Sequence, residues 1–265
     1  MNLIRLVALV FVGACGTSAA LAAEPLRLEE AVSRALAAHP SIAAETAQLQ
    51  AVRARTQREA LPPPYTIGGE VENVAGNGNL RGIRSAETTL RIGRVIELGG
   101  KREARQTLGQ AELREQEHQA TKTRIDLASS TTARFIEVLA RQQRLTYAEE
   151  RIKQAERTRQ EVAAWVKAAR NPDSDLQAAE IAVAEAQLNR ENAEHELASA
   201  KMTLAASWGA TIPDFGEVVG DLQTLPTVAP FETLAARLPM TPELWASRLR
   251  ADTIGARRRL AEAEA

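Results

Sequence analysis

The stretch that decides the fold is residues 171–209, which read NPDSDLQAAEIAVAEAQLNRENAEHELASAKMTLAASWG. Small and apolar residues return here at alternating intervals of three and four, as in one long helix with a single packing seam. The seam positions are Leu176, Ala179, Val183, Ala186, Ala193, Leu197, Ala200 and Leu204, with Arg190 at the one polar position. Alanines on a seam allow a close approach of the neighbouring helix. Gly209 is typical of a helix C-terminus.

The partner of this helix is predicted in the segment that precedes it. Residues 101–169 contain no proline and only one glycine, Gly109. Their second half carries the same 3-4 spacing at Leu145, Ala148, Ile152, Ala155, Val162 and Val166. Asn171-Pro172 interrupts the helix, and Ser174 followed by Gln177 predicts a capping box that starts the next one. Two long helices joined by a short turn predict an antiparallel α-hairpin over residues 100–208.

Upstream of this α-hairpin the period changes from 3.6 to 2, which predicts a β-hairpin over residues 65–95. Residues 75–79 supply its turn chemistry. One predicted face is apolar: Tyr65, Ile67, Val71, Leu90 and Ile92. The opposite predicted face is charged: Glu70, Glu72, Glu87 and Arg91. In a soluble domain the apolar face would pack on a core, whereas in a membrane barrel it would face lipid and the charged face a wet lumen.

The sequence pattern of the N-terminal helices recurs near the C-terminus. Residues 28–61 predict two helices, broken at His39-Pro40, with Ser41 as the N-cap of the second. After a proline-rich linker over residues 209–230, a shift of 202 places residues 231–265 on residues 29–63. The identities are Glu30 with Glu232, Leu36 with Leu238, Pro40 with Pro242, Ala44 with Ala246, Ala54 with Ala256 and Arg55 with Arg257. We interpret residues 23–230 as one repeat and residues 231–265 as the truncated start of a second.

The N-terminus predicts export. A basic start, an apolar run over residues 6–14 and the small-residue site at 20–22 are typical of a secretory signal peptide spanning residues 1–22. The only cysteine, Cys15, ends a sequence that loosely resembles a lipobox, so a mature chain beginning at a lipidated Cys15 is the alternative. No other segment is apolar enough for a transmembrane helix, so any membrane span is expected to consist of strands.

Composition favours long, closely packed helices over one thick core. The 265 residues are 45% apolar and 25% charged, and they include 50 alanines but only 9 aromatic residues. The 33 basic and 34 acidic residues are interspersed and give a net charge of −1, which argues against nucleic-acid binding. We find no catalytic or cofactor motif. His39, His118 and His195 lie on three segments, so no metal site is expected.

These elements, in this order, resemble the TolC-like outer-membrane efflux family. The resemblance rests on residues 28–32 (LEEAV) with His39-Pro40, on residues 94–102 (RVIELGGKR) and on residues 175–180 (DLQAAE). The string at 94–102 resembles the cobalt–zinc–cadmium, CzcC-like branch in particular. Two positions depart from the family pattern: His39 stands in place of asparagine, and residues 169–171 replace a glycine at the tip of the α-hairpin.

The resemblance implies a mostly α protein that forms a homotrimeric channel, with a long α-helical tube and a β-barrel in the outer membrane. It implies passive conduction of exported substrates, chiefly divalent heavy-metal cations, as part of a tripartite RND-type pump, with no enzymatic activity and no cofactor. The partners would be a periplasmic membrane-fusion adaptor, an inner-membrane RND pump and outer-membrane lipid. The expected docking tip is Arg170, Asn171, Pro172, Asp173, Ser174 and Asp175. The alternatives are a periplasmic adaptor, a coiled-coil structural protein, or a fragment without function.

Overall fold

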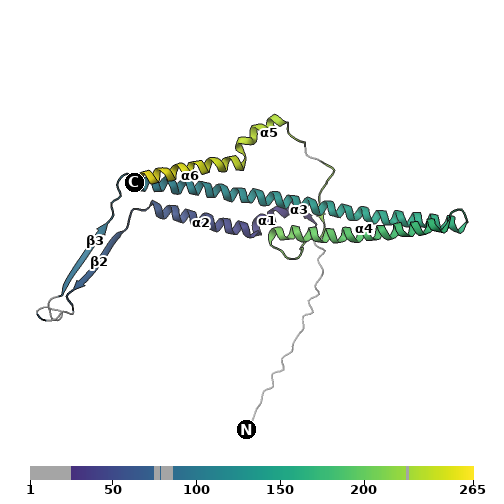
Figure 1. The fold of residues 1–265 in the computed structure, drawn as a ribbon, viewed down its shortest axis with the longest axis horizontal. Helices are drawn as coiled ribbons and strands as arrows, with labels where there is room; N and C mark the ends of the chain where they lie inside the picture. The colour runs from purple at the N-terminus through teal and green to yellow at the C-terminus, as the bar shows by residue number, and fades with distance from the viewer. Residues whose placement is uncertain (1–24, 75–77, 79–85, 225–226) are drawn as a thin grey trace, which may run out of the picture. The chain divides into compact units, whose positions relative to one another are not determined.

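The computed structural model describes residues 25–74, 78, 86–224 and 227–265, which form two compact units (Figure 1). The elements in chain order are β1 (Leu26–Arg27), α1 (Leu28–Ala38), α2 (Pro40–Ala60), β2 (Tyr65–Glu72), β3 (Glu87–Arg94), α3 (Lys101–Lys167), α4 (Asp173–Ala205), a 3-10 helix (Ala206–Trp208), β4 (Val218–Val219), α5 (Phe231–Arg237), a second 3-10 helix (Leu238–Met240) and α6 (Pro242–Glu264). The predicted class, mostly helical with one β-hairpin, is confirmed. The predicted signal peptide with Cys15, and the turn at 75–79 apart from Gly78, lie outside the described residues.

The first unit contains the α-hairpin, formed by α4 and the part of α3 from Phe135 onward. The predicted seam is the contact face, since Ala186, Ala193 and Leu204 of α4 are buried, and so are Val138 and Ala148 of α3. Every other seam position of α4 is at least half-buried, Arg190 included. The alternating spacing therefore located the interface correctly, because a helix turns its i, i+3 and i+7 positions to one side.

The linker at 209–230 has more structure than its prolines indicated. Val218 pairs in parallel with Leu26, and both side chains are buried together with Phe215. The Gln142 side chain of α3 accepts a hydrogen bond from the Val218 N–H at 2.8 Å and donates one to the Val218 carbonyl at 3.1 Å. The side-chain amide of Gln142 thus extends the hydrogen bonding of the β1–β4 pair by one partner. This pairing is not predictable from the sequence, because strands of two residues are too short to show a periodicity.

Both ends of the α-hairpin close with the same backbone motif. At the tip, Arg170 N–H donates to the Trp165 carbonyl and Ala169 N–H to the Val166 carbonyl, both at 2.9 Å, and Ala169 has φ 54°. After α4, Ala210 N–H donates to the Ala205 carbonyl at 3.2 Å, and Gly209 has φ 80°. Each is a Schellman C-cap, which requires a left-handed residue. Glycine provides that conformation freely at position 209, and alanine adopts it under strain at position 169.

We expect opposite stability changes from exchanging these two residues. Ala169→Gly should raise the free energy of unfolding by about 0.5–1 kcal/mol, because relief of left-handed strain exceeds the added flexibility of the unfolded chain. Gly209→Ala should lower it by about 1 kcal/mol, since a Cβ there meets no atom within 4 Å and only the backbone conformation is penalised. Thermal unfolding followed by circular dichroism measures both changes. Shifts of the same sign would contradict this account.

The second unit contains the β-hairpin and the first part of α3, with α2 and α6 on opposite sides of that helix (Figure 1). The polar stretch of α3 near residues 114–124 is held by side-chain pairs. From α2, Arg53 pairs with Glu117 at 2.9 Å and Glu45 accepts from Gln116 at 2.9 Å. From α6, the Pro242 carbonyl lies 2.7 Å from Nε2 of His118. Along this stretch, α2 and α6 contact α3 through hydrogen bonds and an ion pair rather than through a row of apolar side chains.

The N-cap of α2 differs from the predicted one. The helix begins at Pro40, and the capping residue is His39, whose Nδ1 accepts a hydrogen bond from Ser41 N–H at 3.1 Å. Ser41 itself lies in the first turn, where its hydroxyl is 2.7 Å from the same imidazole nitrogen. An asparagine at position 39 would cap through its side-chain oxygen. His39 caps the helix in the same way, with Nδ1 as the hydrogen-bond acceptor.

The segment from Glu97 to Arg102 connects β3 to α3 and binds the ends of two other helices. Gly99 and Gly100 both have positive φ, 73° and 74°, which this sharp change of direction requires. Arg102 donates to the Ala60 carbonyl at the end of α2 at 2.9 Å, and Lys101 to the Glu264 carbonyl at the end of α6 at 3.3 Å. Side-chain donors therefore satisfy carbonyls that a helix end leaves unpaired.

Glu97 fixes this connection through Arg105. The guanidinium donates two hydrogen bonds to the carboxylate, the Nη2–Oε2 bond measuring 2.8 Å. These bonds hold the pKa of Glu97 below its usual value, against the opposing effect of desolvation. A lowered folded-state pKa means that the pair contributes its stability in full above the unfolded-state pKa of about 4.3 and loses it as the pH falls through the folded-state value.

Acidification should therefore weaken the connection. Between pH 7 and pH 3 we expect the melting temperature of the unmodified protein to fall more steeply than that of Glu97→Gln, because glutamine has no proton to bind. Differential scanning calorimetry across this range is the measurement. The control is Glu103→Gln. The Glu103 side chain is exposed and lies outside the Glu97–Arg105 pair, and the hydrogen bond from Thr107 goes to its backbone carbonyl, which the substitution keeps. The melting temperature of this variant should change with pH as that of the unmodified protein does. Parallel pH profiles for Glu97→Gln and the unmodified protein would refute the role given to Glu97.

Candidate functional site

The β-hairpin is the first candidate site, and its register sorts side chains by polarity. The antiparallel pairing places Ile67 opposite Ile92, Gly69 opposite Leu90 and Val71 opposite Thr88. Because directly opposed residues project from the same face, the five apolar residues named from the sequence share one face. Glu70, Glu72, Glu87 and Arg91 share the other face, where Arg91 pairs with Glu70 at 2.9 Å. Glu72 lies directly opposite Glu87, so like charges meet at the far end.

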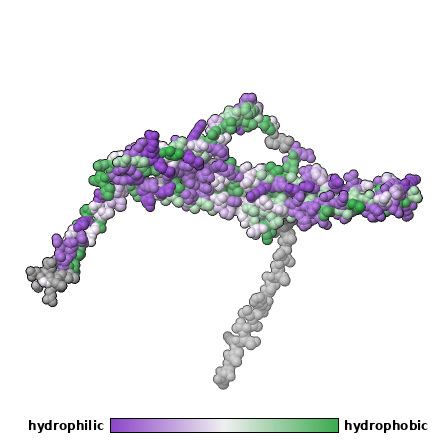
Figure 2. Space-filling view, in the orientation of Figure 1, coloured by the Kyte–Doolittle hydropathy of each residue, from purple (hydrophilic) through white to green (hydrophobic). Residues whose placement is uncertain are grey.

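The apolar face of this hairpin is bare. Ile67 and Leu90 are both 80% exposed, and no described residue covers the face they share. In a surface hairpin of a soluble domain, these side chains would pack on the core of that domain. Among the described residues, no such core covers them. Figure 2 shows that the hydrophobic surface continues past the end of β3, where Val95, Ile96 and Leu98 are also exposed. We call the exposed face formed by Tyr65, Ile67, Val71, Leu90 and Ile92 the apolar band.

One end of the band carries an aromatic and a cationic side chain. Tyr65 and Arg94 are opposed in the register, the guanidinium carbon lies 5.0 Å from the ring centroid, and Arg94 Nη1 is 3.4 Å from the Tyr65 hydroxyl. Such pairs are typical of the level where an apolar phase meets water, because the ring and stem are apolar while the ends are polar. Sequence reasoning assigned Tyr65 to the apolar face but did not single out Arg94, whose position opposite Tyr65 is visible only in the register.

The second candidate site is the tip of the α-hairpin, residues 170–175. Arg170, Pro172, Asp173 and Ser174 are exposed, whereas Asn171 and Asp175 are half-buried. Asn171 Nδ2 donates to Asp175 Oδ2 at 2.8 Å, which ties the turn to the first turn of α4. The capping box predicted at Ser174 is wrong in position, because α4 begins one residue earlier, at Asp173. Both aspartates therefore lie in the first turn, at the positive end of the helix dipole.

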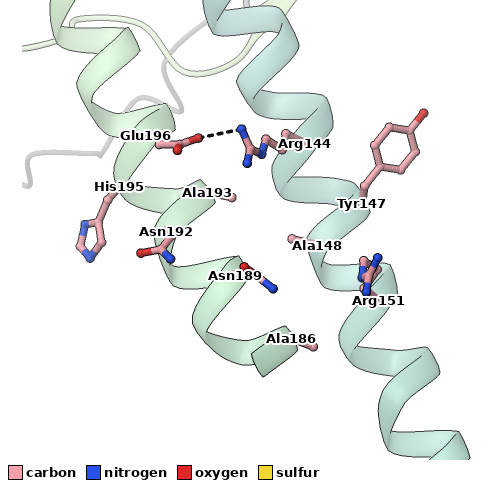
Figure 3. Close-up of a pocket in the computed structure, with 10 residues that line it drawn as sticks. All are labelled: Arg144, Tyr147, Ala148, Arg151, Ala186, Asn189, Asn192, Ala193, His195 and Glu196. Atoms are coloured by element: carbon pink, nitrogen blue, oxygen red, sulfur yellow. Dashed lines mark ion pairs between the residues drawn. The ribbon is translucent and has the colours of Figure 1, made fainter. Parts of the chain in front are cut away.

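A third feature is a groove of about 600 Å³ between α3 and α4 (Figure 3). Ala148, Ala186 and Ala193 form its floor, and polar side chains form its rim, among them Arg144, which pairs with Glu196 at 3.3 Å. His195 also lines the groove, and its imidazole points away from α3 in Figure 3. The groove exists because alanines face each other across the contact between α3 and α4, and their small side chains leave space there. Its rim offers hydrogen-bonding groups but no paired nucleophile and base.

Neither a metal-ion site nor a membrane-spanning helix is found among the described residues. Among them, no three His, Cys, Asp or Glu side chains gather closely enough to hold a metal ion. His39 and His118 are engaged in the hydrogen bonds given above. In the same part of the chain, no helix has both the length and the hydrophobicity to cross a bilayer.

Comparison with known proteins agrees with this geometry. The outer membrane efflux protein family matches residues 31–210. The chain is 30% identical over 233 residues to the cobalt-zinc-cadmium resistance protein CzcC of Cupriavidus metallidurans, covering 87% of this chain and 54% of that protein. Its fold is similar to that of CusC, with a TM-score of 0.72, 17% identity and coverage of 89% and 56%. It is also similar to the CmeC outer membrane channel of Campylobacter jejuni, with a TM-score of 0.67, 13% identity and coverage of 89% and 52%.

The chain thus combines a long α-hairpin with a β-hairpin whose apolar face is bare. The chain belongs to the outer membrane efflux protein family, whose members are transport channels and not enzymes. It spans about half the length of the relatives that it matches.

Proposed function

We propose that this protein is the outer-membrane channel component of a tripartite RND-type efflux pump, which passively conducts divalent heavy-metal cations out of the periplasm. The observation that supports this most is the β-hairpin, since it exposes one apolar and one charged face and no described residue covers the apolar one. In this proposal the apolar face contacts outer-membrane lipid, and Glu70, Glu72, Glu87 and Arg91 line a wet lumen. The hairpin contributes strands to a closed barrel in a homotrimer.

The remaining parts of the proposal follow the same arrangement. The α-hairpin extends into the periplasm as part of a helical tube, and its tip docks a membrane-fusion adaptor or the RND pump. Residues 23–230 form a first repeat and residues 231–265 begin a second. Conduction needs no catalytic residue or cofactor, so the partner pump supplies the energy. Similarity to a cobalt-zinc-cadmium resistance protein supports divalent metal cations as the substrate class.

A Gram-negative host that lacks its own metal exit channel provides the test. The protein is produced from its complete gene, together with the adaptor and the RND pump of a cobalt–zinc–cadmium efflux system. Membranes are then fractionated, and growth is measured in zinc, cobalt and cadmium. We expect recovery in the outer-membrane fraction and resistance to these ions, but not to hydrophobic drugs. Recovery in the soluble periplasmic fraction would refute the channel and favour a periplasmic adaptor. Drug resistance without metal resistance would refute the substrate class alone.

A further inference from the structure

One charged side chain, that of Arg94, lies on the same face of the β-hairpin as the apolar band. In the register this face consists of the opposed pairs Tyr65–Arg94, Ile67–Ile92, Gly69–Leu90 and Val71–Thr88. The other charged residues of the two strands project from the opposite face: Glu70, Glu72, Glu87 and Arg91. Arg94 is therefore the one exception in β2 and β3 to a clean separation of charged from apolar side chains.

The guanidinium of Arg94 has no carboxylate partner among the described residues. It contacts Tyr65, whose ring centroid is 5.0 Å from the guanidinium carbon and whose hydroxyl is 3.4 Å from Nη1. By contrast, Arg91 pairs with Glu70 at 2.9 Å on the other face. The next carboxylate along the chain, that of Glu97, receives two hydrogen bonds from Arg105. Within the described chain, the charge of Arg94 is thus not neutralised.

The position of Arg94 along β3 places this charge among exposed apolar side chains. It lies two residues beyond Ile92, about 7 Å further along the strand. This is the end at which β2 and β3 continue toward α2 and α3 (Figure 1). Two residues later, Ile96 is exposed as well. A cation among apolar side chains that face lipid is costly unless an anion pairs with it, and phosphate is the anion that a bilayer supplies at its surface.

Phosphate also suits the hydrogen-bonding groups that this pair presents. A guanidinium donates two parallel hydrogen bonds to phosphate oxygens. The contact with the Tyr65 ring uses the face of the guanidinium rather than its N–H groups, so most of these remain available to a ligand. The Tyr65 hydroxyl, next to Nη1, can donate a further hydrogen bond to the same phosphate.

We infer that Arg94 and Tyr65 form a binding site for the phosphate of an anionic glycerophospholipid. This rests on the proposed function, in which the apolar band contacts outer-membrane lipid and the helices lie in the periplasm. The site is at the end of the hairpin nearest the helices, so it meets the periplasmic leaflet. Phosphates of lipopolysaccharide, in the other leaflet, would lie beyond Val71 at the opposite end of the band. Because the cation is uncompensated, the site prefers a headgroup with net negative charge.

Lipid retention by the purified protein tests this site. Protein produced from its complete gene is titrated in detergent with phosphatidylglycerol, and bound lipid is counted by native mass spectrometry. Arg94→Gln should weaken binding by about five-fold or more, the effect of one cation at an anionic headgroup. Arg94→Lys should be intermediate, because an ammonium lacks the bidentate geometry.

The matched control for this titration is Arg91→Gln. It removes the same charge from the same strand, but from the opposite face, and should bind phosphatidylglycerol like the unmodified protein. Equal losses in Arg91→Gln and Arg94→Gln, or no loss in either, would overturn the inference.

Three competitors distinguish the possible sources of the phosphate. Phosphatidylcholine, lipopolysaccharide and inorganic phosphate are each added, at equal concentration, to protein loaded with phosphatidylglycerol. We expect the bound phosphatidylglycerol to remain in all three cases. Displacement by lipopolysaccharide would overturn the assignment to a glycerophospholipid, displacement by phosphatidylcholine the preference for an anionic headgroup, and displacement by inorganic phosphate the lipid site itself.

Solid-state NMR tests the direct contact. In phosphatidylglycerol bilayers, the signal of ¹³C-labelled guanidinium carbons is dephased by nearby ³¹P. Part of this dephasing should disappear in Arg94→Gln and persist in Arg91→Gln, whereas unchanged dephasing in Arg94→Gln would overturn the inference. Outer-membrane recovery is scored separately. Recovery in that membrane with lipid retention independent of Arg94 would refute the site alone, and recovery of the unmodified protein in the soluble periplasmic fraction would refute the proposed channel.

Discussion

Replacing Leu90 with lysine is expected to remove most of the protein from the outer-membrane fraction. Leu90 lies on the bare apolar face of the hairpin, near the middle of β3. A lysine on the lipid side of a barrel strand costs about 2–4 kcal/mol at the bilayer midplane and much less near its surfaces. That cost corresponds to about a 30- to 700-fold shift of the insertion equilibrium for each copy. In the proposed homotrimer the free-energy cost is incurred once in each copy.

The neighbouring residue provides the matched control for this experiment. Thr89 projects from the opposite, charged face, where Glu70 lies directly across from it in the register. Thr89→Lys introduces the same charge one residue away and should leave membrane recovery intact, since a cation in a wet lumen remains hydrated. Quantitative immunoblots of outer-membrane and soluble fractions measure both variants. Equal recovery of Leu90→Lys and Thr89→Lys would show that the apolar face does not contact lipid.

The double change Asp173→Lys and Asp175→Lys is expected to abolish capture of the adaptor and, with it, metal resistance. Both carboxylates lie at the exposed end of the α-hairpin, in the first turn of α4. Two charges are reversed, so the net charge of the proposed docking surface changes by four units. Like-charge contacts cost several kcal/mol in an interface. We therefore expect at least a hundred-fold loss of affinity in a pull-down, and growth in cadmium reduced to that of cells without the channel.

The same change also acts on the helix itself, and the control must separate the two effects. Removing two acidic residues from a helix N-terminus costs about 0.3–1 kcal/mol each, and the hydrogen bond from Asn171 to Asp175 is lost as well. Glu180→Lys with Glu191→Lys reverses equal charge further along the same helix, on exposed positions. That control should keep adaptor binding. Docking at the tip is refuted when both variants capture the adaptor like the unmodified protein.

Several features of the fold were predictable from local patterns alone. The 3-4 spacing on α4 identified Ala186, Ala193 and Leu204 as contact residues, because the geometry of a single helix determines which residues share a face. The alternation in residues 65–95 sorted the nine hairpin residues in the same way that the register does. Such predictions succeed where one element's own period carries the information.

Other features depended on residues distant in sequence. The pairing of Leu26 with Val218 joins segments almost two hundred residues apart, and neither strand is long enough to show a period. The cap at His39 was assigned to Ser41, because serine has the stronger general preference and only the folded backbone brings the imidazole to the Ser41 N–H. The polar stretch near Glu117 gave no hint of its partners, since ion pairs between helices leave no hydrophobic pattern.

The sequence by itself determined the helices, the hairpin and their order, because backbone hydrogen bonding and side-chain periodicity act over a few neighbouring residues. Only the tertiary structure decided which faces of α2 and α6 are occupied. Ala51 and Thr253 coincide under the 202-residue shift, yet Ala51 is exposed and Thr253 is buried. The physical reason is that burial depends on which helix lies alongside, and α3 offers one side to α2 and the other to α6.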